Sequence, residues 1–212
     1  MPERVLLVNA SPRGGESHSL HIAETFVAAY RATLPDVYVD RLDTFELPPF
    51  GQRHVEAKMA VIARQDVPGD AAREWAQVLD VAARVQAADT LVFAVPMWNG
   101  GIPWSLKLFI DTVTQPGIAF SFNPVDGYRG LLGGRRAVTI YTSRVYSPGV
   151  APEFGTDHQS TYLRWWLEYC GITDIHELRL QPTFPDDGLA ARQSRAAEEA
   201  RELAHKLAVG VR

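Results

Sequence analysis

The sequence predicts an α/β fold in which five parallel strands form one sheet with helices on both faces. Short apolar runs without polar alternation, typical of strands buried on both faces, recur along the chain. Between them lie segments with apolar residues three and four positions apart, the period of an amphipathic helix. Strands that alternate with helices pair in parallel through right-handed crossovers. The 212 residues suit one domain with a sizeable core, and no linker or repeat divides residues 1–212.

The first part of the chain predicts two strands and one or two helices. The run RVLLVNA at residues 4–10 is apolar without alternation and predicts the first strand. After a polar loop, apolar residues at helical spacing predict a helix at residues 20–34. DVYVDRL at residues 36–42 predicts the second strand, which a Pro-Pro-Phe-Gly turn follows. Residues 54–65 could be helical before the turn residues DVPGD interrupt them.

The middle of the chain repeats this pattern. Residues 71–88 predict a long helix, with Trp75, Val78 or Leu79, Ala82 and Val85 on its apolar face. Next, DTLVFAV at residues 89–95 predicts a third buried strand, and residues 105–113 predict a helix. Residues 117–136 alternate apolar and polar side chains and then turn, which predicts a hairpin or a lid.

The last part of the chain completes the alternation. AVTIYTS at residues 137–143 predicts the fourth strand. A helix at residues 161–170 is expected to end at Gly171, where a left-handed residue is needed. DIHELRL at residues 174–180 predicts the fifth strand, and residues 190–209 form a final amphipathic helix.

A doubly wound sheet of five strands has 2-1-3-4-5, the flavodoxin-like order, as its natural arrangement. The first and third strands are then neighbours, and ligands bind outside the carboxyl ends of the strands where the order reverses. The loops that leave these strands are ASPRGGESHS at residues 10–19 and PMWNGGIP at residues 96–103. We therefore expect a binding site between these two loops.

The composition excludes several classes of protein. A net charge of −4 without a basic stripe argues against a nucleic-acid partner. Cys170 is the single cysteine, so we expect neither an internal disulfide nor a bound metal, and an inert buried thiol. No segment reaches the roughly 18 apolar residues of a membrane span, and the first apolar run is too short for a signal peptide. These observations predict a cytoplasmic protein that does not contact a membrane.

The first loop has the donors that a phosphate monoester needs. It contains neither of the glycine-rich fingerprints of dinucleotide and triphosphate sites. Instead, Ser11, Ser17 and Ser19 supply hydroxyls at the start of a helix, where free amides and the helix dipole attract an anion. Arg13 could add charge or face water. Two other interpretations stay open: Ser17 or Ser19 could only cap the helix, and Ser11 could be a nucleophile with His158 as its base.

The second loop suits a planar heteroaromatic group. Met97 and Trp98 could lie against a ring face, and Asn99 could hold the loop or bind the ring. Pro96 restricts the start of the loop, and Gly100 permits close approach of the backbone. The alternative is that Met97 and Trp98 only fill a gap in the core.

Four stretches of the sequence resemble the FMN-dependent NADH azoreductases and the related flavodoxin-like NAD(P)H quinone reductases. They are the serine loop SPRGGESHS, PMWNGGIPWSLKLFID at residues 96–111, YTSR at residues 141–144 and YLRWWLEYCGITDI at residues 162–175. The second stretch is the most specific. Together the four run from the first strand to the fifth, so the resemblance covers nearly the whole chain.

The resemblance implies a site for tightly but non-covalently bound FMN. Ser11, Ser17, His18 and Ser19 are the residues implied for the ribityl-phosphate end. Those implied for the isoalloxazine ring are Pro96, Met97, Trp98, Asn99, Gly100, Ser143 and Arg144. The chain departs from the family at Val145 and Tyr146, where two glycines are common.

The resemblance also implies an oxidoreductase that reduces quinones and azo compounds with electrons from NADH or NADPH. Hydride would pass to flavin N5, and a flat aromatic acceptor, such as a quinone, an azo or a nitroaromatic compound, would then take two electrons at the same place. One site used twice predicts ping-pong kinetics and needs no catalytic side chain. The alternatives are a flavodoxin-type electron carrier, for which −4 is a small charge, and a serine hydrolase using Ser11 and His158. For Asp157 the favoured interpretation is a helix cap.

The family further implies a homodimer with its sites at the subunit interface. A flavin that forms the floor of such a site needs a roof, and four aromatic residues are candidates for it: Phe50, Phe120, Phe122 and Tyr128. Four more aromatic residues exceed the needs of one small core and hint at an interface, although each alone fits a core: Trp104, Trp165, Trp166 and Tyr169.

Overall fold

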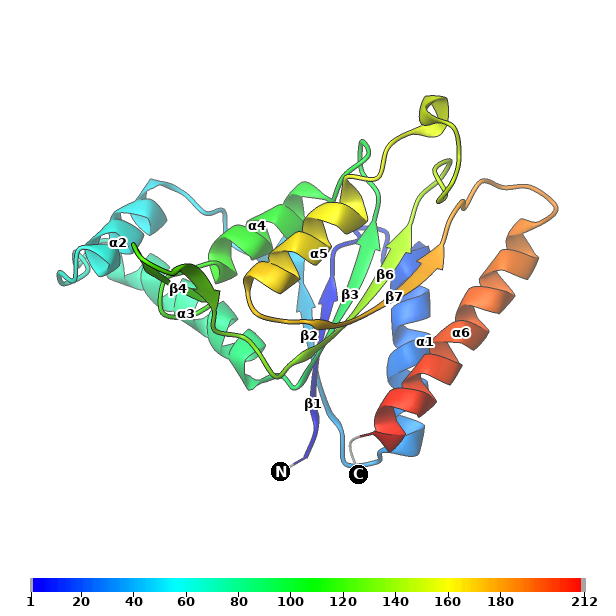
Figure 1. Ribbon diagram of the computed structural model, residues 1–212, viewed down its shortest axis with the longest axis horizontal. Helices are drawn as coiled ribbons and strands as arrows, with labels where there is room; N and C mark the ends of the chain where they lie inside the picture. The colour runs from blue at the N-terminus through cyan, green and yellow to red at the C-terminus, as the bar shows by residue number, and fades with distance from the viewer. Residues whose placement is uncertain (1, 211–212) are drawn as a thin grey trace.

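Five strands form a parallel sheet in the order β2-β1-β3-β6-β7 (Figure 1). The computed structural model describes residues 2–210. The strands of this sheet are β1 (Arg4–Asn9), β2 (Tyr38–Asp43), β3 (Thr90–Pro96), β6 (Arg136–Thr142) and β7 (Asp174–Leu180). The order is the predicted 2-1-3-4-5, with β1 and β3 side by side, so the predicted flavodoxin-like fold class is confirmed.

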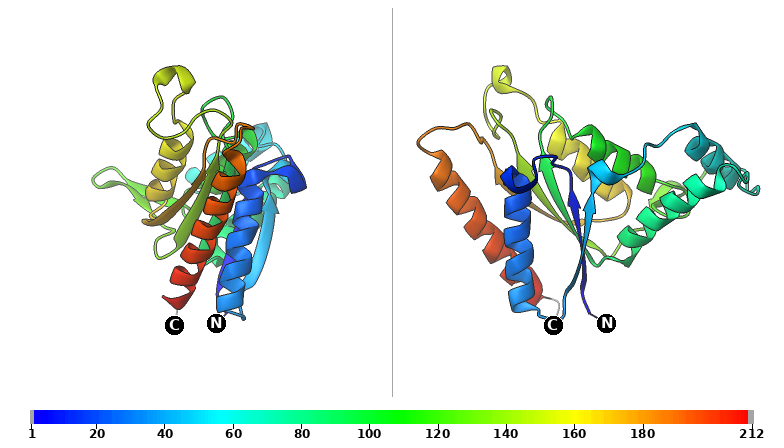
Figure 2. Two further views of the ribbon diagram at one scale, coloured as in Figure 1. Left: turned by 90° about the vertical axis from the view of Figure 1, so that its right-hand side faces the viewer. Right: turned by 180° about the vertical axis from the view of Figure 1, so that it is seen from behind.

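Helices cover both faces of the sheet (Figures 1 and 2). One face packs against α1 (His18–Thr33) and α6 (Leu189–Val209), and the other against α3 (Ala72–Ala87), α4 (Trp104–Val113) and α5 (Gln159–Tyr169). Successive side chains of β1 alternate between these two cores: Val5 and Leu7 face α1 and α6, and Leu6 and Val8 face the other layer. Burial on both faces explains why the strands read as continuous apolar runs.

The edge of the helical layer is extended by α2 (Gln52–Ile62), which packs on α3. On α3 the apolar face includes Val78, which is 1% exposed, whereas Leu79 is 45% exposed and lies outside it. Two short 3-10 helices, η1 (Gly14–Glu16) and η2 (Thr44–Glu46), follow β1 and β2, and a third, η3 (Pro152–Phe154), follows β6. Within residues 2–210, every helix is too short or too polar to cross a membrane.

A hairpin of β4 (Phe120–Asn123) and β5 (Gly127–Gly130) projects from the body of the molecule (Figure 2). The sequence predicted a hairpin or a lid here. Its base is a contact between two glycine backbones, because a Cβ on Gly130 would lie 2.2 Å from the carbonyl carbon of Cys170. Gly171, with a φ of 91°, ends α5 as predicted, and a Cβ on it would lie 3.2 Å from the carbonyl carbon of Gly130.

The aromatic residues on α4 and α5 divide between core and surface. Trp166 is 1% exposed, and its ring packs edge-on against Phe93 and Phe109. Trp104 and Trp165 are instead 58% and 54% exposed. The neighbouring Cys170 is buried, and burial raises the pKa of its thiol to about 12, which agrees with the expected inert thiol.

Candidate functional site

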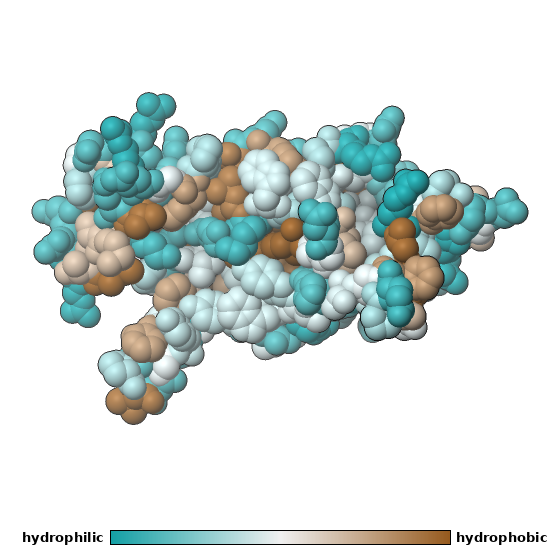
Figure 3. All heavy atoms as spheres, turned by 90° about the horizontal axis from the view of Figure 1, so that it is seen from above, coloured by the Kyte–Doolittle hydropathy of each residue, from teal (hydrophilic) through white to brown (hydrophobic). Residues whose placement is uncertain are grey.

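Loops from four strands meet at the carboxyl ends of β1, β3, β6 and β7 and enclose a cavity of about 330 Å³. Figure 3 looks onto this end of the molecule, where hydrophilic and apolar side chains both reach the surface. We call this space the four-loop cavity; its volume lies in the range of small-molecule sites. Eight of the eleven residues predicted from the sequence line it: Ser11, Ser17, His18, Pro96, Met97, Trp98, Ser143 and Arg144.

A turn built on Asn9 positions the first of these residues. The amide of Ser11 donates to Asn9 Oδ1 (3.0 Å), and Asn9 Nδ2 donates to the carbonyl oxygen of Ser11 (3.1 Å). Asn side chains commonly stabilise turns in this way. Asn9, which the sequence analysis did not single out, therefore fixes the point where β1 ends and the serine loop begins.

The start of α1 explains the roles of the next two serines. Ser17 Oγ accepts from the amide of Leu20 (3.2 Å), so Ser17 caps α1 and also lines the four-loop cavity. This cap begins the helix at His18, two residues before the predicted start at residue 20. Ser19 is 1% exposed and does not line the cavity; its hydroxyl lies 3.2 Å from that of Ser17. The loop therefore presents Ser17 and keeps Ser19 as its support.

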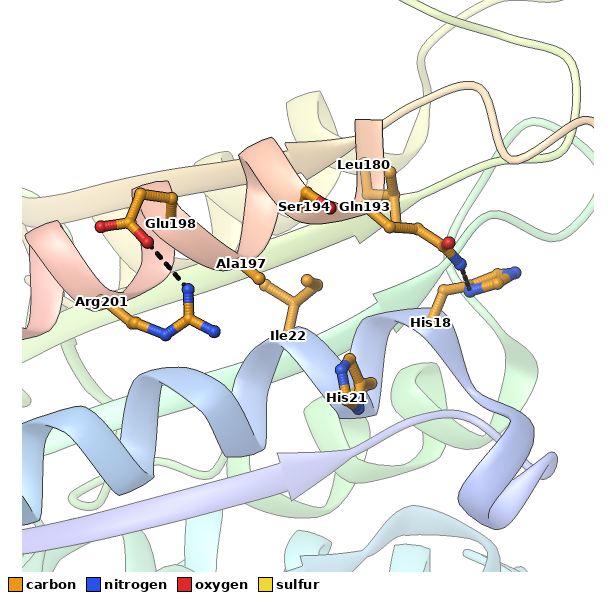
Figure 4. Close-up of a pocket in the computed structure, with 9 residues that line it drawn as sticks. All are labelled: His18, His21, Ile22, Leu180, Gln193, Ser194, Ala197, Glu198 and Arg201. Carbon is orange, nitrogen blue, oxygen red and sulfur yellow. Dashed lines mark hydrogen bonds and ion pairs between the residues drawn. The ribbon is translucent and has the colours of Figure 1, made fainter. Parts of the chain in front are cut away.

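His18 separates the four-loop cavity from a groove between α1 and α6 (Figure 4). Its Nδ1 lies 3.3 Å from Nε2 of Gln193 on α6. Burial, followed by the positive charges of Arg13 and His21, lowers the pKa of His18 below its ordinary 6.5. The ring is therefore predominantly neutral at pH 7 and can donate one hydrogen bond without carrying a charge.

The second loop is a tight turn at the end of β3. The amide of Met97 donates to Thr142 (2.7 Å), and Trp98 and Gly101 exchange two backbone hydrogen bonds of 2.9 Å. Asn99 and Gly100 have φ values of 50° and 81°, as in a type I′ turn, for which Asn-Gly is the favoured sequence. These two residues form the tip of the loop and do not line the cavity, so the structure does not place them against a ligand there.

Trp98 lies in the cavity wall and is not a core residue. Its side chain is 37% exposed, and its ring centroid lies 6.2 Å from that of Phe45 in η2. Phe45 also packs edge-on against Trp104 at 5.4 Å. The alternative that Trp98 only fills a gap in the core is therefore wrong.

The loops after β6 and β7 contribute further lining residues. The amide of Thr183 donates to the carbonyl oxygen of Ser143 (2.7 Å), as does its hydroxyl (3.1 Å), which joins these two loops. The Ser143 hydroxyl donates to the carbonyl oxygen of Tyr146. Four lining residues were missed in the sequence: Thr142, Thr183, Pro185 and Leu189. The predicted strand order could have revealed those after the fifth strand, because the loop that follows this strand reaches the same carboxyl edge of the sheet.

The charges around the cavity favour an anion. Arg13 and Arg144 both line it, and no carboxylate does so in the part of the chain that the structure describes. Within the same residues, no group of three His, Cys, Asp or Glu side chains is placed to hold a metal ion.

The residues of the hydrolase alternative are not assembled. His158 does not line the four-loop cavity with Ser11, and its amide donates to the carbonyl oxygen of Gly100 (2.9 Å). The Asp157 carboxylate accepts from the amide and hydroxyl of Ser160 (2.7 and 2.6 Å), so it caps α5 as interpreted from the sequence. Burial alone would raise its pKa, but these bonds and the charge of Arg179 lower it.

Comparison with known proteins relates this site to one family. Residues 3–207 match a family described by its flavodoxin-like fold. An FMN-dependent NADH:quinone oxidoreductase of Ruegeria pomeroyi is 44% identical, over 91% of this chain and 96% of its own. FMN-dependent NADH:quinone oxidoreductase 3 of Pseudomonas fluorescens is 40% identical, over 97% of each chain. The crystal structure of azoreductase from Bacillus anthracis str. Sterne superposes with a TM-score of 0.85 at 27% identity, covering 96% of this chain and 99% of that one. This chain belongs to the family of flavodoxin-like FMN-dependent NADH:quinone oxidoreductases and azoreductases.

Proposed function

We propose that this chain binds FMN in the four-loop cavity and uses it to pass two electrons from NADH to quinones and azo compounds. The observation that carries the proposal is the convergence of separate sequence segments on one cavity. Residues predicted for a phosphate come from the loop after β1, and residues predicted for a planar ring come from the loops after β3 and β6. NADH as the donor, and quinones and azo compounds as the acceptors, are taken from the activities named for the relatives.

The phosphate end of FMN is assigned to the start of α1. Ser11 and Ser17 offer hydroxyls, and the first amides of α1 have no intrahelical carbonyl to bind. Arg13 lines the cavity and supplies positive charge, although its guanidinium also lies 3.5 Å from the carboxylate of Glu16, which does not line the cavity. A phosphate monoester fits this set of donors without a metal ion.

The ring end is assigned to the loops after β3 and β6. The cavity is lined by Pro96, Met97 and Trp98 from the end of β3 and the loop after it, and by Ser143 and Arg144 from the loop after β6. Because the tip at Asn99 and Gly100 does not line the cavity, we assign to these two residues the shaping of the loop rather than a ring contact.

When bound, FMN supplies the chemistry of hydride acceptance and donation at its N5 atom. The protein residues hold the ring in place and admit the nicotinamide and the acceptor in turn, which gives ping-pong kinetics. Arg144, which lines the cavity, would supply positive charge to offset the negative charge of reduced FMN. No side-chain nucleophile is required, in keeping with the protonated and buried state of Cys170.

A homodimer is part of the proposal. None of the four predicted roof residues is among the described residues that line the four-loop cavity, so a second subunit is a natural source of the roof. Aromatic side chains line a hollow of about 560 Å³ between α4, α5 and the projecting hairpin. Tyr128 and Trp165, which line it, are 62% and 54% exposed. Large exposed apolar patches commonly mark subunit contacts.

Purified protein incubated with FMN tests the proposal. We expect the protein to turn yellow and to show FMN binding in calorimetry. It should then oxidise NADH with 2,3-dimethoxy-5-methyl-1,4-benzoquinone and give parallel double-reciprocal plots. A flavodoxin-type carrier would bind FMN but fail to turn over with NADH, and a serine hydrolase would stay colourless. Either of these two results would overturn the proposal.

A further inference from the structure

A second hollow of about 460 Å³ lies beside the four-loop cavity and is built on two of the same loops. Val145, Val150 and Phe154 line it from the loop after β6, and Pro182 and Phe184 line it from the loop after β7. Its walls are almost entirely apolar, and we call it the apolar hollow. The loop after β6, which contains η3, stands above the carboxyl end of the sheet (Figure 1).

The side chains of the apolar hollow are unusually exposed for their type. Phe154, Phe184 and Val145 are 56%, 48% and 46% exposed. Large apolar groups in contact with water carry a hydration cost that an apolar ligand removes. Such groups arranged around a concave surface therefore indicate a binding site for an apolar group.

One stretch of chain forms the wall between the two spaces. Pro182 and Phe184 line the apolar hollow, whereas the alternate residues Thr183 and Pro185 line the four-loop cavity. This single stretch of chain therefore separates the two spaces.

Arg144 links the two spaces on the opposite loop. It lines the four-loop cavity, and the next residue, Val145, lines the apolar hollow. The guanidinium carbon of Arg144 lies 5.6 Å from the ring centroid of Phe184. Residues of both loops thus lie between the four-loop cavity and the apolar hollow.

We infer that the apolar hollow binds the aliphatic tail of a quinone whose ring is reduced at the four-loop cavity. The inference rests on the proposed function and names its substrate class: quinones with an alkyl or isoprenoid substituent. An alkyl chain fits because it has no polar groups to satisfy. A peptide segment would bring backbone amides and carbonyls that these walls cannot pair.

The size of the expected effect follows from the transfer of methylene groups. Each methylene moved from water into an apolar site strengthens binding by about four-fold. A tail with a few methylenes in the apolar hollow should therefore lower both KM and the dissociation constant by at least about ten-fold.

Two quinones that differ only in the tail provide the test. The FMN-loaded protein is assayed for NADH oxidation with 2,3-dimethoxy-5-methyl-1,4-benzoquinone and with its 6-decyl derivative below micellar concentration. Calorimetry without NADH measures the binding of each oxidised quinone directly. We expect the decyl compound to bind at least about ten-fold more tightly and to have the lower KM.

Variants then locate the tail. Phe154→Gln should remove most of the advantage of the decyl compound, and the shape-conserving Val150→Thr should remove part of it, while the tail-less quinone is unaffected. Met59→Gln on α2 is the control, because Met59 is also 56% exposed and does not line the apolar hollow.

The outcomes separate this inference from the proposed function. Failure to reduce the tail-less quinone would reject the proposed function, while calorimetry would still report on the apolar hollow. Equal binding of the two quinones would overturn the inference. An equal loss of the decyl compound's binding advantage in Phe154→Gln and Met59→Gln would overturn it as well.

Discussion

Asn9 Nδ2 donates to Asp43 Oδ2 across 3.0 Å and so joins the carboxyl ends of β1 and β2. Asp43 Oδ1 in turn accepts from the amide of Phe45 (2.9 Å), whose ring packs near Trp98. One chain of contacts therefore braces the serine loop and the tryptophan loop, which both line the four-loop cavity.

Asn9→Ala removes this brace together with the turn that holds Ser11. We expect the dissociation constant of FMN to rise by about ten-fold, since each hydrogen bond contributes about 1 kcal/mol. Flavin fluorescence titration measures it. Asn123→Ala is the control, because Asn123 accepts similar turn bonds from Val125 (2.9 Å) and Asp126 (2.8 Å) on the distant hairpin. Equal affinities for Asn9→Ala and wild type would show that the brace does not position the site.

Gly100→Ala should destabilise the second loop. Its φ of +81° disfavours any side chain, and a Cβ would lie 3.3 Å from the carbonyl oxygen of Thr156. We expect the free energy of unfolding to fall by about 1–2 kcal/mol, and FMN to bind less tightly. The neighbouring Gly101→Ala is the matched control, since its nearest contact would be 3.8 Å away. Urea unfolding of both variants measures the difference, and equal stabilities would contradict it.

Two substitutions at Ser17 separate its structural role from its proposed phosphate contact. Ser17→Ala should cost about 1 kcal/mol in stability, because the cap to Leu20 is lost. Ser17→Asp keeps a good cap but places a negative charge in the phosphate site. We expect Ser17→Asp to retain wild-type stability, to bind FMN at least about ten-fold more weakly and to bind riboflavin normally. A parallel loss of riboflavin affinity would mean that Ser17 does not contact the phosphate.

His18 makes the stability of the FMN-free protein depend on pH. Its folded-state pKa lies below the 6.5 of an unfolded histidine, so the unfolded state takes up a proton first as the pH falls. The free energy of unfolding should therefore decline below pH 6.5, and His18→Gln should weaken this decline. NMR titration of the ring should also show its pKa rising when FMN is added. An unchanged pKa would place the phosphate elsewhere.

Arg144→Ala should lower the midpoint potential of bound FMN and slow its reduction by NADH, because a positive charge that favours the reduced form is lost. Arg144→Lys keeps the charge and should retain most of the potential. A redox titration of the two variants against wild type measures the shift. If Arg144→Ala has the wild-type potential and rate, Arg144 has no electrostatic role.

The strand order and half of the site followed from local sequence signals. Apolar runs such as residues 4–10 are typical of strands in a parallel sheet covered on both faces, and the order of strands then brings the serine loop beside residues 96–103. Ser11 and Ser17 were predicted because hydroxyls next to a helix start can bind a phosphate, and both line the cavity.

Other parts of the site depend on contacts that residue type does not reveal. Thr183 and Leu189 line the cavity only because the loop after β7 folds onto the loop after β6. Nor does helical spacing show that Trp166 is buried while Trp165 is exposed, since the neighbouring layers decide it. Asn99 and Gly100 were predicted to lie against a ring, but Asn-Gly also favours a type I′ turn, and the turn places both residues at the tip of the loop.

The bare contact between Gly130 and Gly171 has a consequence for how this protein can diversify. A methyl group on Gly130 would collide with the backbone of Cys170 and Gly171, and one on Gly171 would lie 3.2 Å from Gly130, so changes at the base of the hairpin and at the end of α5 are coupled. Substitutions are therefore tolerated best at the far end of the hairpin, around Val125, which is 91% exposed. Related proteins can thus differ in the length and side chains of the outer part of the hairpin, and so in their partners, while the sheet and its cofactor loops stay as they are.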